Sequence, residues 1–138
     1  MAAVVGYTTG VYDMFHIGHL NLLRNASESC DELIVGVTSD DLSIAAKGKR
    51  PIVPYDERAE IVASVRYVDR VVEQRSMDKM AAWQRLHFDV MFVGDDWRGT
   101  TAWERIERDF GELGVRIAYF PYTPHTSSTA LRRTVFGA

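Results

Sequence analysis

The chain has 138 residues, of which 46% are hydrophobic, and its formal net charge is −3. This length and composition predict a single domain over residues 1–138 with a buried core, and they exclude a disordered chain. The negative charge argues against broad binding to nucleic acid or to acidic membranes. One cysteine cannot form an internal disulfide, and the apolar stretch from Ala2 to Val5 is too short for a signal peptide or a membrane span, so we expect a cytoplasmic protein.

Short runs of β-branched and apolar residues alternate with segments of helical spacing. The runs that predict strands are Val4 to Thr8, Leu33 to Thr38, Arg70 to Glu73, Val90 to Val93 and Val115 to Phe120. The apolar residues at helical spacing are Leu20, Leu23 and Ala26, then Ile61, Val62 and Val65, and later Trp103, Ile106 and Phe110. Thr101 and Glu104 fit a capping box for the last helix.

This alternation predicts an α/β fold, in which a five-stranded parallel sheet is covered by helices on both faces. Ligands of such sheets bind beyond the carboxyl ends of the strands, at the point where the strand order reverses. We therefore expect the loops after the first and the fourth strand to meet at the functional site.

The segment His16-Ile17-Gly18-His19 follows the first strand. Two imidazoles three positions apart share one face of a helix, and the free N–H groups at a helix start favour anions. Gly18 permits close approach of a ligand, and Gly10 lets the chain turn out of the strand. These features predict a triphosphate site. The alternatives are ordinary first-turn residues or half of a zinc site. The other candidate zinc ligands, none of them suitably spaced, are His87, His125 and Cys30.

After the fourth strand, Gly94-Asp95-Asp96-Trp97 presents two carboxylates and an indole. Carboxylates at this place can accept hydrogen bonds from the amino group of a base or from a sugar hydroxyl. The alternative is a helix cap with a tryptophan that packs in the core.

A basic cluster, Lys47-Gly48-Lys49-Arg50-Pro51, precedes a helix whose start is marked by Pro54, Asp56 and Glu57. The lysine ammonium is a mobile point charge that can follow phosphate oxygens, so we expect this loop to close over phosphates. The alternative is a solvated basic loop. Arg58 and Arg66 either bind phosphate or pair with carboxylates, and their spacing does not decide between the two.

Hydroxyl residues from Thr126 to Thr129 follow the fifth strand and precede Arg132. One hydroxyl is enough to cap a helix. The surplus hydroxyls, with the free N–H groups and the arginine, predict a second anion site.

His-Ile-Gly-His after a strand, with a late Ser-Ser-Thr-x-x-Arg, resembles the nucleotidyltransferase superfamily that includes pantetheine-phosphate and nicotinamide mononucleotide adenylyltransferases. The segment from Lys47 to Arg58, the run Val65-Arg66-Tyr67-Val68-Asp69 and the run from Gly94 to Trp97 are similar to the cytidylyltransferase branch, above all to glycerol-3-phosphate cytidylyltransferases. The resemblance implies a Rossmann-like nucleotidyltransferase fold.

The resemblance also implies the reaction. A phosphomonoester oxygen attacks the α-phosphorus of CTP in line, and pyrophosphate leaves. The implied acceptor is glycerol 3-phosphate or another polyol phosphate, an aminoalcohol phosphate or a phosphonate. Mg²⁺ is expected to be carried mainly by the CTP triphosphate, without a dedicated protein site. The implied state is a homodimer that binds neither nucleic acid nor a membrane.

By the same resemblance, the catalytic residues are His16, His19, Lys47 and Lys49, with Lys47 nearer the acceptor and Lys49 nearer the nucleotide. The implied nucleotide-binding residues are Thr9, Gly10, Val11, Tyr12, Gly18, Gly94, Asp96, Trp97, Tyr122, Thr123, Ser127, Ser128, Thr129 and Arg132. The implied acceptor-binding residues are Asp13, Lys47, Arg66 and Lys79, and Asp13 orients either Mg²⁺ or the acceptor.

Two positions depart from the family pattern. Tyr122 stands where these cytidylyltransferases have an arginine, and Val11 stands where threonine is common. Arg132 would restore the missing charge in the manner of the adenylyltransferases, so an adenylyltransferase remains an alternative. A third alternative is a nucleotide-binding module without catalysis, against which the presence of both histidines and both lysines argues.

Overall fold

The computed structural model describes residues 2–121 and residue 131 of the chain. Its five strands are β1 (Val5–Gly10), β2 (Glu32–Thr38), β3 (Arg70–Gln74), β4 (Val90–Gly94) and β5 (Arg116–Phe120). All neighbouring strands pair in parallel, in the order β3-β2-β1-β4-β5. The predicted α/β fold with a five-stranded parallel sheet is therefore confirmed, and each strand end lies within two residues of its predicted place.

The helices of the described residues connect these strands in the order in which they occur in the chain. They are α1 (Ile17–Glu28), α2 (Asp40–Lys47), α3 (Tyr55–Ala63), α4 (Lys79–Leu86) and α5 (Thr101–Gly111), with a short 3₁₀ helix η1 (Asp95–Trp97) after β4. None of the helices within the described residues is long and apolar enough to cross a membrane.

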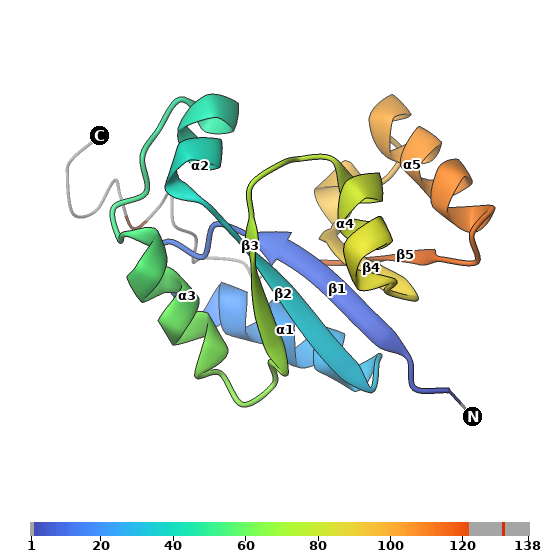
Figure 1. The fold of residues 1–138 in the computed structure, drawn as a ribbon, viewed down its shortest axis with the longest axis horizontal. Helices are drawn as coiled ribbons and strands as arrows, with labels where there is room; N and C mark the ends of the chain where they lie inside the picture. Colours follow the sequence, from blue (N-terminus) through green and yellow to red (C-terminus); the bar gives the residue numbers. More distant parts are fainter. Residues whose placement is uncertain (1, 122–130, 132–138) are drawn as a thin grey trace.

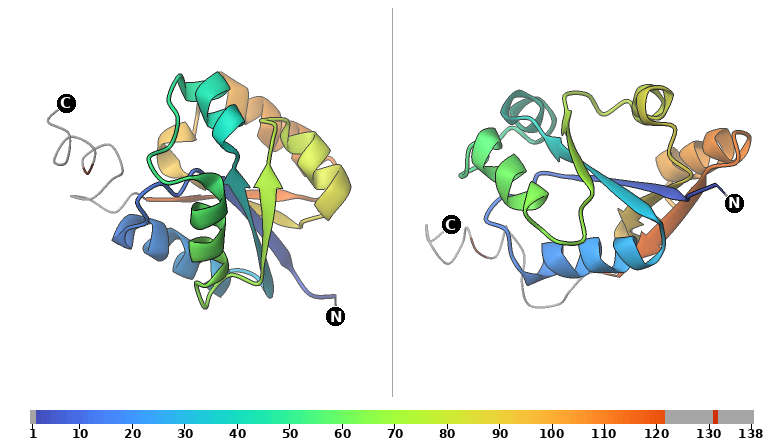
Figure 2. Two further views of the ribbon diagram at one scale, coloured as in Figure 1. Left: turned by 60° about the vertical axis from the view of Figure 1, so that its left-hand side comes forward. Right: turned by 60° about the horizontal axis from the view of Figure 1, so that its bottom comes forward.

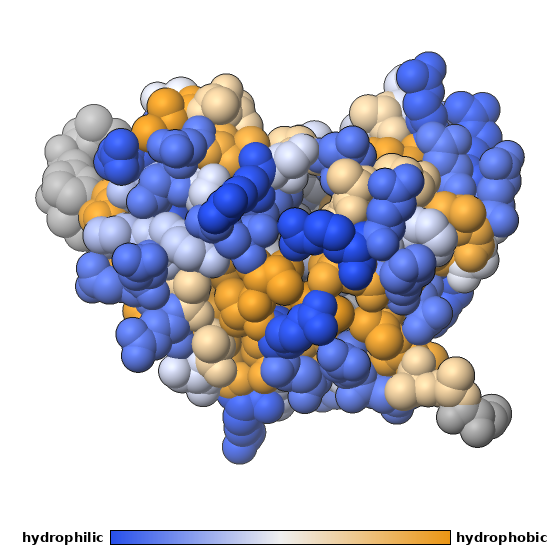
Figure 3. All heavy atoms as spheres, viewed as in Figure 1, coloured by the Kyte–Doolittle hydropathy of each residue, from blue (hydrophilic) through white to orange (hydrophobic). Residues whose placement is uncertain are grey.

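Two hydrophobic cores lie on opposite faces of the sheet, as the alternation of side chains along a strand requires. On one face, Leu33, Val35 and Val37 of β2 pack with α1 and α3. On the other, Ile34 of β2 and Met91 of β4 pack with α4 and α5. Helices thus cover both faces (Figures 1 and 2), and the surface is indented between α2 and the α4 and α5 side (Figure 3).

Strands β1 and β4 separate toward their carboxyl ends. Strand β1 pairs with β2 along its whole length, up to Gly10 with Val37. Its pairing with β4 ends at Tyr7 with Met91, although both strands continue. Strand order reverses at this pair, so the gap is the place where a parallel sheet of this kind takes its ligand. Strands β1 and β4 are neighbours, as the prediction requires, so the loops after them begin on either side of this gap.

Two local predictions are wrong, and two helices were missed. The N-cap of α5 is Thr100, whose hydroxyl accepts a hydrogen bond from the Trp103 N–H, so Thr101 and Glu104 do not form the predicted capping box. Helix α3 ends at Ala63, before Val65, and the Ile61 side chain is exposed rather than buried. Helices α2 and α4 were not predicted individually; each has only eight residues, which is too short for a clear apolar periodicity.

Candidate active site

His16 and His19 form a reciprocal cap at the start of α1. Nδ1 of His16 accepts a hydrogen bond from the Gly18 N–H at 3.0 Å, and Nδ1 of His19 accepts one from the His16 N–H at 3.2 Å. The two rings are stacked with their centroids 3.8 Å apart. His16 is therefore the N-cap residue rather than a residue of the first turn. This geometry fixes both rings against the end of the helix.

The caps determine which nitrogen of each ring carries the proton. A ring nitrogen that accepts a hydrogen bond holds no proton, so in the neutral ring the proton is on Nε2. Burial lowers the pKa of His19 to about 4, with a further lowering by His16 and an opposing effect of Asp13. Burial also lowers the pKa of His16. In the ligand-free protein at neutral pH, both histidines are therefore uncharged donors through Nε2–H.

The same shifts predict how stability depends on pH. The unfolded chain takes up protons on His19 below its ordinary pKa of 6.5, whereas the folded chain resists until about pH 4. The stability due to this group is fully present above pH 6.5 and is lost as the pH falls toward 4. Urea unfolding at a series of pH values should show this loss, and it should be smaller in His19→Asn. If the free energy of unfolding falls equally steeply with pH in both proteins, the low pKa of His19 is contradicted.

The loop from β1 to α1 holds two non-glycine residues in the left-handed region, Tyr12 with φ 55° and Met14 with φ 49°. Gly10 makes room for this loop. A Cβ atom on Gly10 would lie 2.9 Å from Cε2 and Cζ of Tyr12. Gly10 is the last residue of β1, paired with Val37, so the chain leaves the strand at this glycine, which does not itself have a positive φ. It is needed for the close approach of the tyrosine ring.

Tyr12 is 3% exposed, and within the described residues its hydroxyl makes no hydrogen bond of normal geometry, although the Thr8 side chain lies near it. A buried polar group without a partner is unfavourable for folding. Replacing Tyr12 by phenylalanine should therefore leave the free energy of unfolding unchanged or raise it by about 1 kcal/mol, as measured by urea unfolding. The comparison is Thr8→Val, which removes the bond from the Thr8 hydroxyl to the Phe92 carbonyl and should destabilise. A clear loss of stability in Tyr12→Phe would contradict this reasoning.

Asp13 connects the histidine loop to the lysine loop. It is 4% exposed, and its two oxygens accept hydrogen bonds from the N–H groups of Ile52 at 2.8 Å and Val53 at 2.9 Å. These partners lie a few residues after Lys49 in the chain. Asp13 therefore holds one loop against the other, and its expected role toward the acceptor or Mg²⁺ stays a prediction.

The two lysines lie at the end of α2 and just beyond it. Lys47 is the last residue of α2, and Gly48 ends the helix in the left-handed conformation with φ 70°. The Lys49 carbonyl accepts a bond from the buried Ser43 hydroxyl at 3.1 Å, which fixes the backbone. Both lysine side chains are exposed. The main chain of this loop is therefore anchored while its ammonium groups remain accessible to a ligand.

The residues after β4 form the other side of the gap. Thr9 lies in β1, and Gly94 ends β4. Asp96 and Trp97 lie in η1, and Trp97 is 49% exposed, so it is not the core tryptophan of the alternative interpretation. Its indole is available at the carboxyl end of the sheet, as a base-binding role requires.

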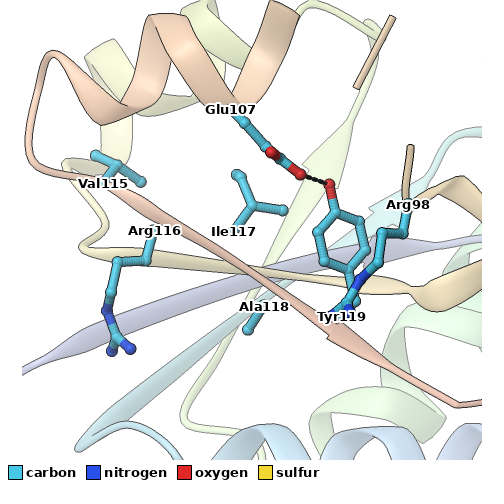
Figure 4. Close-up of a pocket in the computed structure, with 7 residues that line it drawn as sticks. All are labelled: Arg98, Glu107, Val115, Arg116, Ile117, Ala118 and Tyr119. Carbon is cyan, nitrogen blue, oxygen red and sulfur yellow. Dashed lines mark hydrogen bonds between the residues drawn. The ribbon is translucent and has the colours of Figure 1, made fainter. Parts of the chain in front are cut away.

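Arg98, directly after Trp97, is attached to β5. Its guanidinium carbon lies 4.8 Å from the centre of the Tyr119 ring, and the Tyr119 hydroxyl is hydrogen-bonded to Glu107 (Figure 4). Burial and this bond raise the pKa of Tyr119 to about 12. The contact anchors the end of η1 to β5 and α5, and sequence reasoning did not identify it.

Two predicted cations lie away from the site, and a third, Arg58, is buried next to the histidine loop. Arg66 is exposed, and its guanidinium carbon lies 5.1 Å from the centre of the Tyr67 ring. It precedes the amino end of β3, at the opposite edge of the sheet from the site, so it does not reach the site of its own chain. Lys79 is at the correct end of the sheet but on the α4 face, 5.0 Å from the Trp103 ring. Burial lowers its pKa. Arg58 is buried and pairs with Asp40, so of its two possible roles the structure shows the pairing with a carboxylate.

The second anion site lies outside the described residues. The predicted members affected are Tyr122, Thr123, Ser127, Ser128, Thr129 and Arg132. Within the described part of the chain, no three histidine, cysteine or carboxylate side chains gather to hold a metal ion.

Residues 7–134 match the cytidylyltransferase-like family. The chain is 32% identical over 131 residues to glycerol-3-phosphate cytidylyltransferase of Staphylococcus aureus (strain NCTC 8325 / PS 47), with 94% of this chain and 93% of that protein covered. It is 42% identical over 119 residues to FAD synthase of Pyrococcus horikoshii, with 82% and 77% covered. The relatives thus differ in their named activities.

A solved structure with a similar fold is the lipopolysaccharide core biosynthesis protein from Thermoplasma volcanium GSS1. The TM-score is 0.74 at 24% identity, with 91% of this chain and all of that chain covered. This likeness concerns the fold alone. The family match spans nearly the whole chain and agrees with the histidine motif at the start of α1. The chain is therefore a nucleotidyltransferase of the cytidylyltransferase-like family.

Proposed function

We propose that this nucleotidyltransferase transfers CMP from CTP to a small phosphomonoester, with glycerol 3-phosphate as the first candidate, and releases pyrophosphate. The main support is the pair of uncharged Nε2–H donors at the start of α1, beside a lysine loop that Asp13 holds in place. The name of the Staphylococcus aureus relative supports the choice of substrates.

In the proposed reaction, an oxygen of the acceptor phosphate forms a bond to the α-phosphorus, and the bond from that phosphorus to the bridging oxygen of pyrophosphate breaks. Negative charge increases on the bridging and non-bridging oxygens. His16 and His19 donate hydrogen bonds to these oxygens, and Lys47 and Lys49 supply positive charge. The acceptor is already an anion and needs no general base, so positioning and charge stabilisation provide the catalysis.

Mg²⁺ belongs to the proposal only as a companion of the triphosphate. The described residues offer no cluster of three ligands, and both Asp13 oxygens accept backbone N–H groups. A hard cation of this kind is commonly held by substrate phosphates with few protein ligands. Homodimer formation and a cytoplasmic location stay predictions.

Transfer of AMP from ATP is the second candidate. It is favoured by Tyr122 in place of the family arginine, by Arg132, and by the 42% identity to FAD synthase, whose named product is an adenine dinucleotide. The middle motifs around Lys47 and Arg58 favour CTP.

Pyrophosphate release distinguishes these functions. CTP and ATP are each incubated with Mg²⁺ and glycerol, ribitol, choline or ethanolamine phosphate, or a small phosphonate, with His19→Asn as the background control. Release with CTP and one acceptor supports the proposal. Release only with ATP selects the adenylyltransferase, and nucleotide binding without release selects a binding module.

A further inference from the structure

Arg58 of α3 is buried at the junction of four segments, with 1% of its surface exposed. Its Nη1 donates to the carbonyl oxygens of Val11 at 2.6 Å and Thr38 at 2.9 Å. Its Nε donates to the Val53 carbonyl at 2.8 Å, and its Nη2 to Asp40 Oδ1 at 2.7 Å. One side chain thus joins the histidine loop, the end of β2, the start of α2 and the segment after the lysine loop.

A buried charge of this kind is not an efficient source of stability. Removing a guanidinium from water is unfavourable, and a buried ion pair is often no more stable than apolar residues of similar volume. Within the described residues, Arg58 has one carboxylate partner, Asp40, and its other hydrogen bonds go to main-chain carbonyls. These bonds fix the geometry of three loops, which apolar packing would not do.

The bond to Val11 has a direct consequence for the phosphate site. A peptide unit is planar and trans, so its C=O and N–H point in opposite directions. Because the Val11 carbonyl points to Arg58, the Tyr12 N–H points away from it. Tyr12 is among the expected nucleotide-binding residues, and the family resemblance implies that it binds phosphate through this N–H. The loop is strained, since Tyr12 and Met14 have positive φ, and such strain persists only when neighbouring groups impose it.

We propose that Arg58 is the positioning residue of the site: it holds the Val11–Tyr12 peptide with its N–H toward the triphosphate and keeps the lysine loop beside it. The inference rests on the proposed function for its kinetic consequence. The guanidinium itself contacts main-chain carbonyls and Asp40, and it acts through the groups that contact the ligand.

The test uses the full chain with Arg58→Lys, which keeps the charge but cannot reach four partners. Without the four bonds of Arg58, the groups that contact the triphosphate should shift. A shift of a catalytic group by about 1 Å lowers turnover by about 10²-fold, so kcat should fall on this scale. The KM for CTP should change by less than about threefold, because the expected base contact at Trp97 involves none of the groups that Arg58 binds. Amide hydrogen exchange at Ile52 and Val53 should become faster, while exchange in β4 and β5 should not.

Two further variants separate positioning from general stability. Phe110→Leu lowers stability from the opposite face of the sheet and should keep wild-type kcat. Asp40→Asn removes the charge that anchors Arg58 and should lower kcat by about three- to tenfold. If Arg58→Lys does not fold, Asp40→Asn decides: wild-type kcat in that variant contradicts the proposal.

A fall in kcat in Phe110→Leu equal to that in Arg58→Lys at the same loss of thermal stability also contradicts it. If the wild-type chain releases no pyrophosphate with any nucleotide, the proposed function fails. Amide exchange then still tests whether Arg58 holds the histidine loop and the lysine loop in place. Faster exchange confined to Ile52 and Val53 in Arg58→Lys then supports the positioning role. Unchanged exchange at these two amides contradicts it.

Discussion

Replacing His19 by asparagine should lower kcat by about 10²- to 10³-fold while the protein stays folded. The asparagine oxygen occupies roughly the place of Nδ1 and still accepts the His16 N–H, so the cap of α1 is kept. What is lost is the Nε2–H donor, which is the group expected to stabilise the reacting phosphate. Steady-state pyrophosphate release, with thermal unfolding of both proteins, measures the two effects separately.

His19→Gln is the matched control, because its amide nitrogen lies near the place of Nε2 and its oxygen does not reach the cap. This variant should keep more activity than His19→Asn and lose more stability, since a missing cap costs about 1 kcal/mol. Near-normal kcat in His19→Asn would remove His19 from the catalytic residues.

Replacing Lys49 by alanine should lower kcat/KM for CTP by about 10²-fold, the scale expected for losing one phosphate-directed cation. Lys47→Ala should act mainly on the acceptor and raise its KM. The backbone of the loop should not change in either variant. Ser43, Asp13 and Arg58 hydrogen-bond to its main chain, and these bonds do not involve the lysine side chains.

Arg105→Ala is the control for a general change in surface charge, since Arg105 is exposed on α5. It should leave kcat and both KM values unchanged. Full activity in both lysine variants would show that the basic cluster is a solvated loop without a role in the reaction. An equal loss in Arg105→Ala would show an effect of net charge rather than of position.

The sheet and the place of the site follow from the sequence because they depend on strong, regular signals. Five apolar runs separated by polar segments predict parallel strands buried on both faces, and β2 has six buried residues in succession. The histidine motif directly after β1 then lies at the carboxyl end of the sheet by topology alone. Side-chain chemistry at that end is enough to indicate a phosphate ligand.

The supporting contacts could not be predicted, because they join segments far apart in the chain. Asp13 binds N–H groups about forty positions away, and Arg58 reaches back 47 positions to Val11. Nothing in the spacing distinguishes such a residue from one that binds a ligand. The reciprocal cap of His16 and His19 is local, yet histidine is not among the usual capping residues, so the motif alone does not indicate it.

A crystal structure of the full chain with CTP and Mg²⁺ tests the central claim most directly. We predict that the α- and β-phosphates lie within hydrogen-bond distance of Nε2 of His16 and His19 and of the Tyr12 N–H, with Lys49 on the opposite side and the cytosine near Trp97. A triphosphate bound away from both imidazoles, with the lysine loop turned toward solvent, would contradict the account.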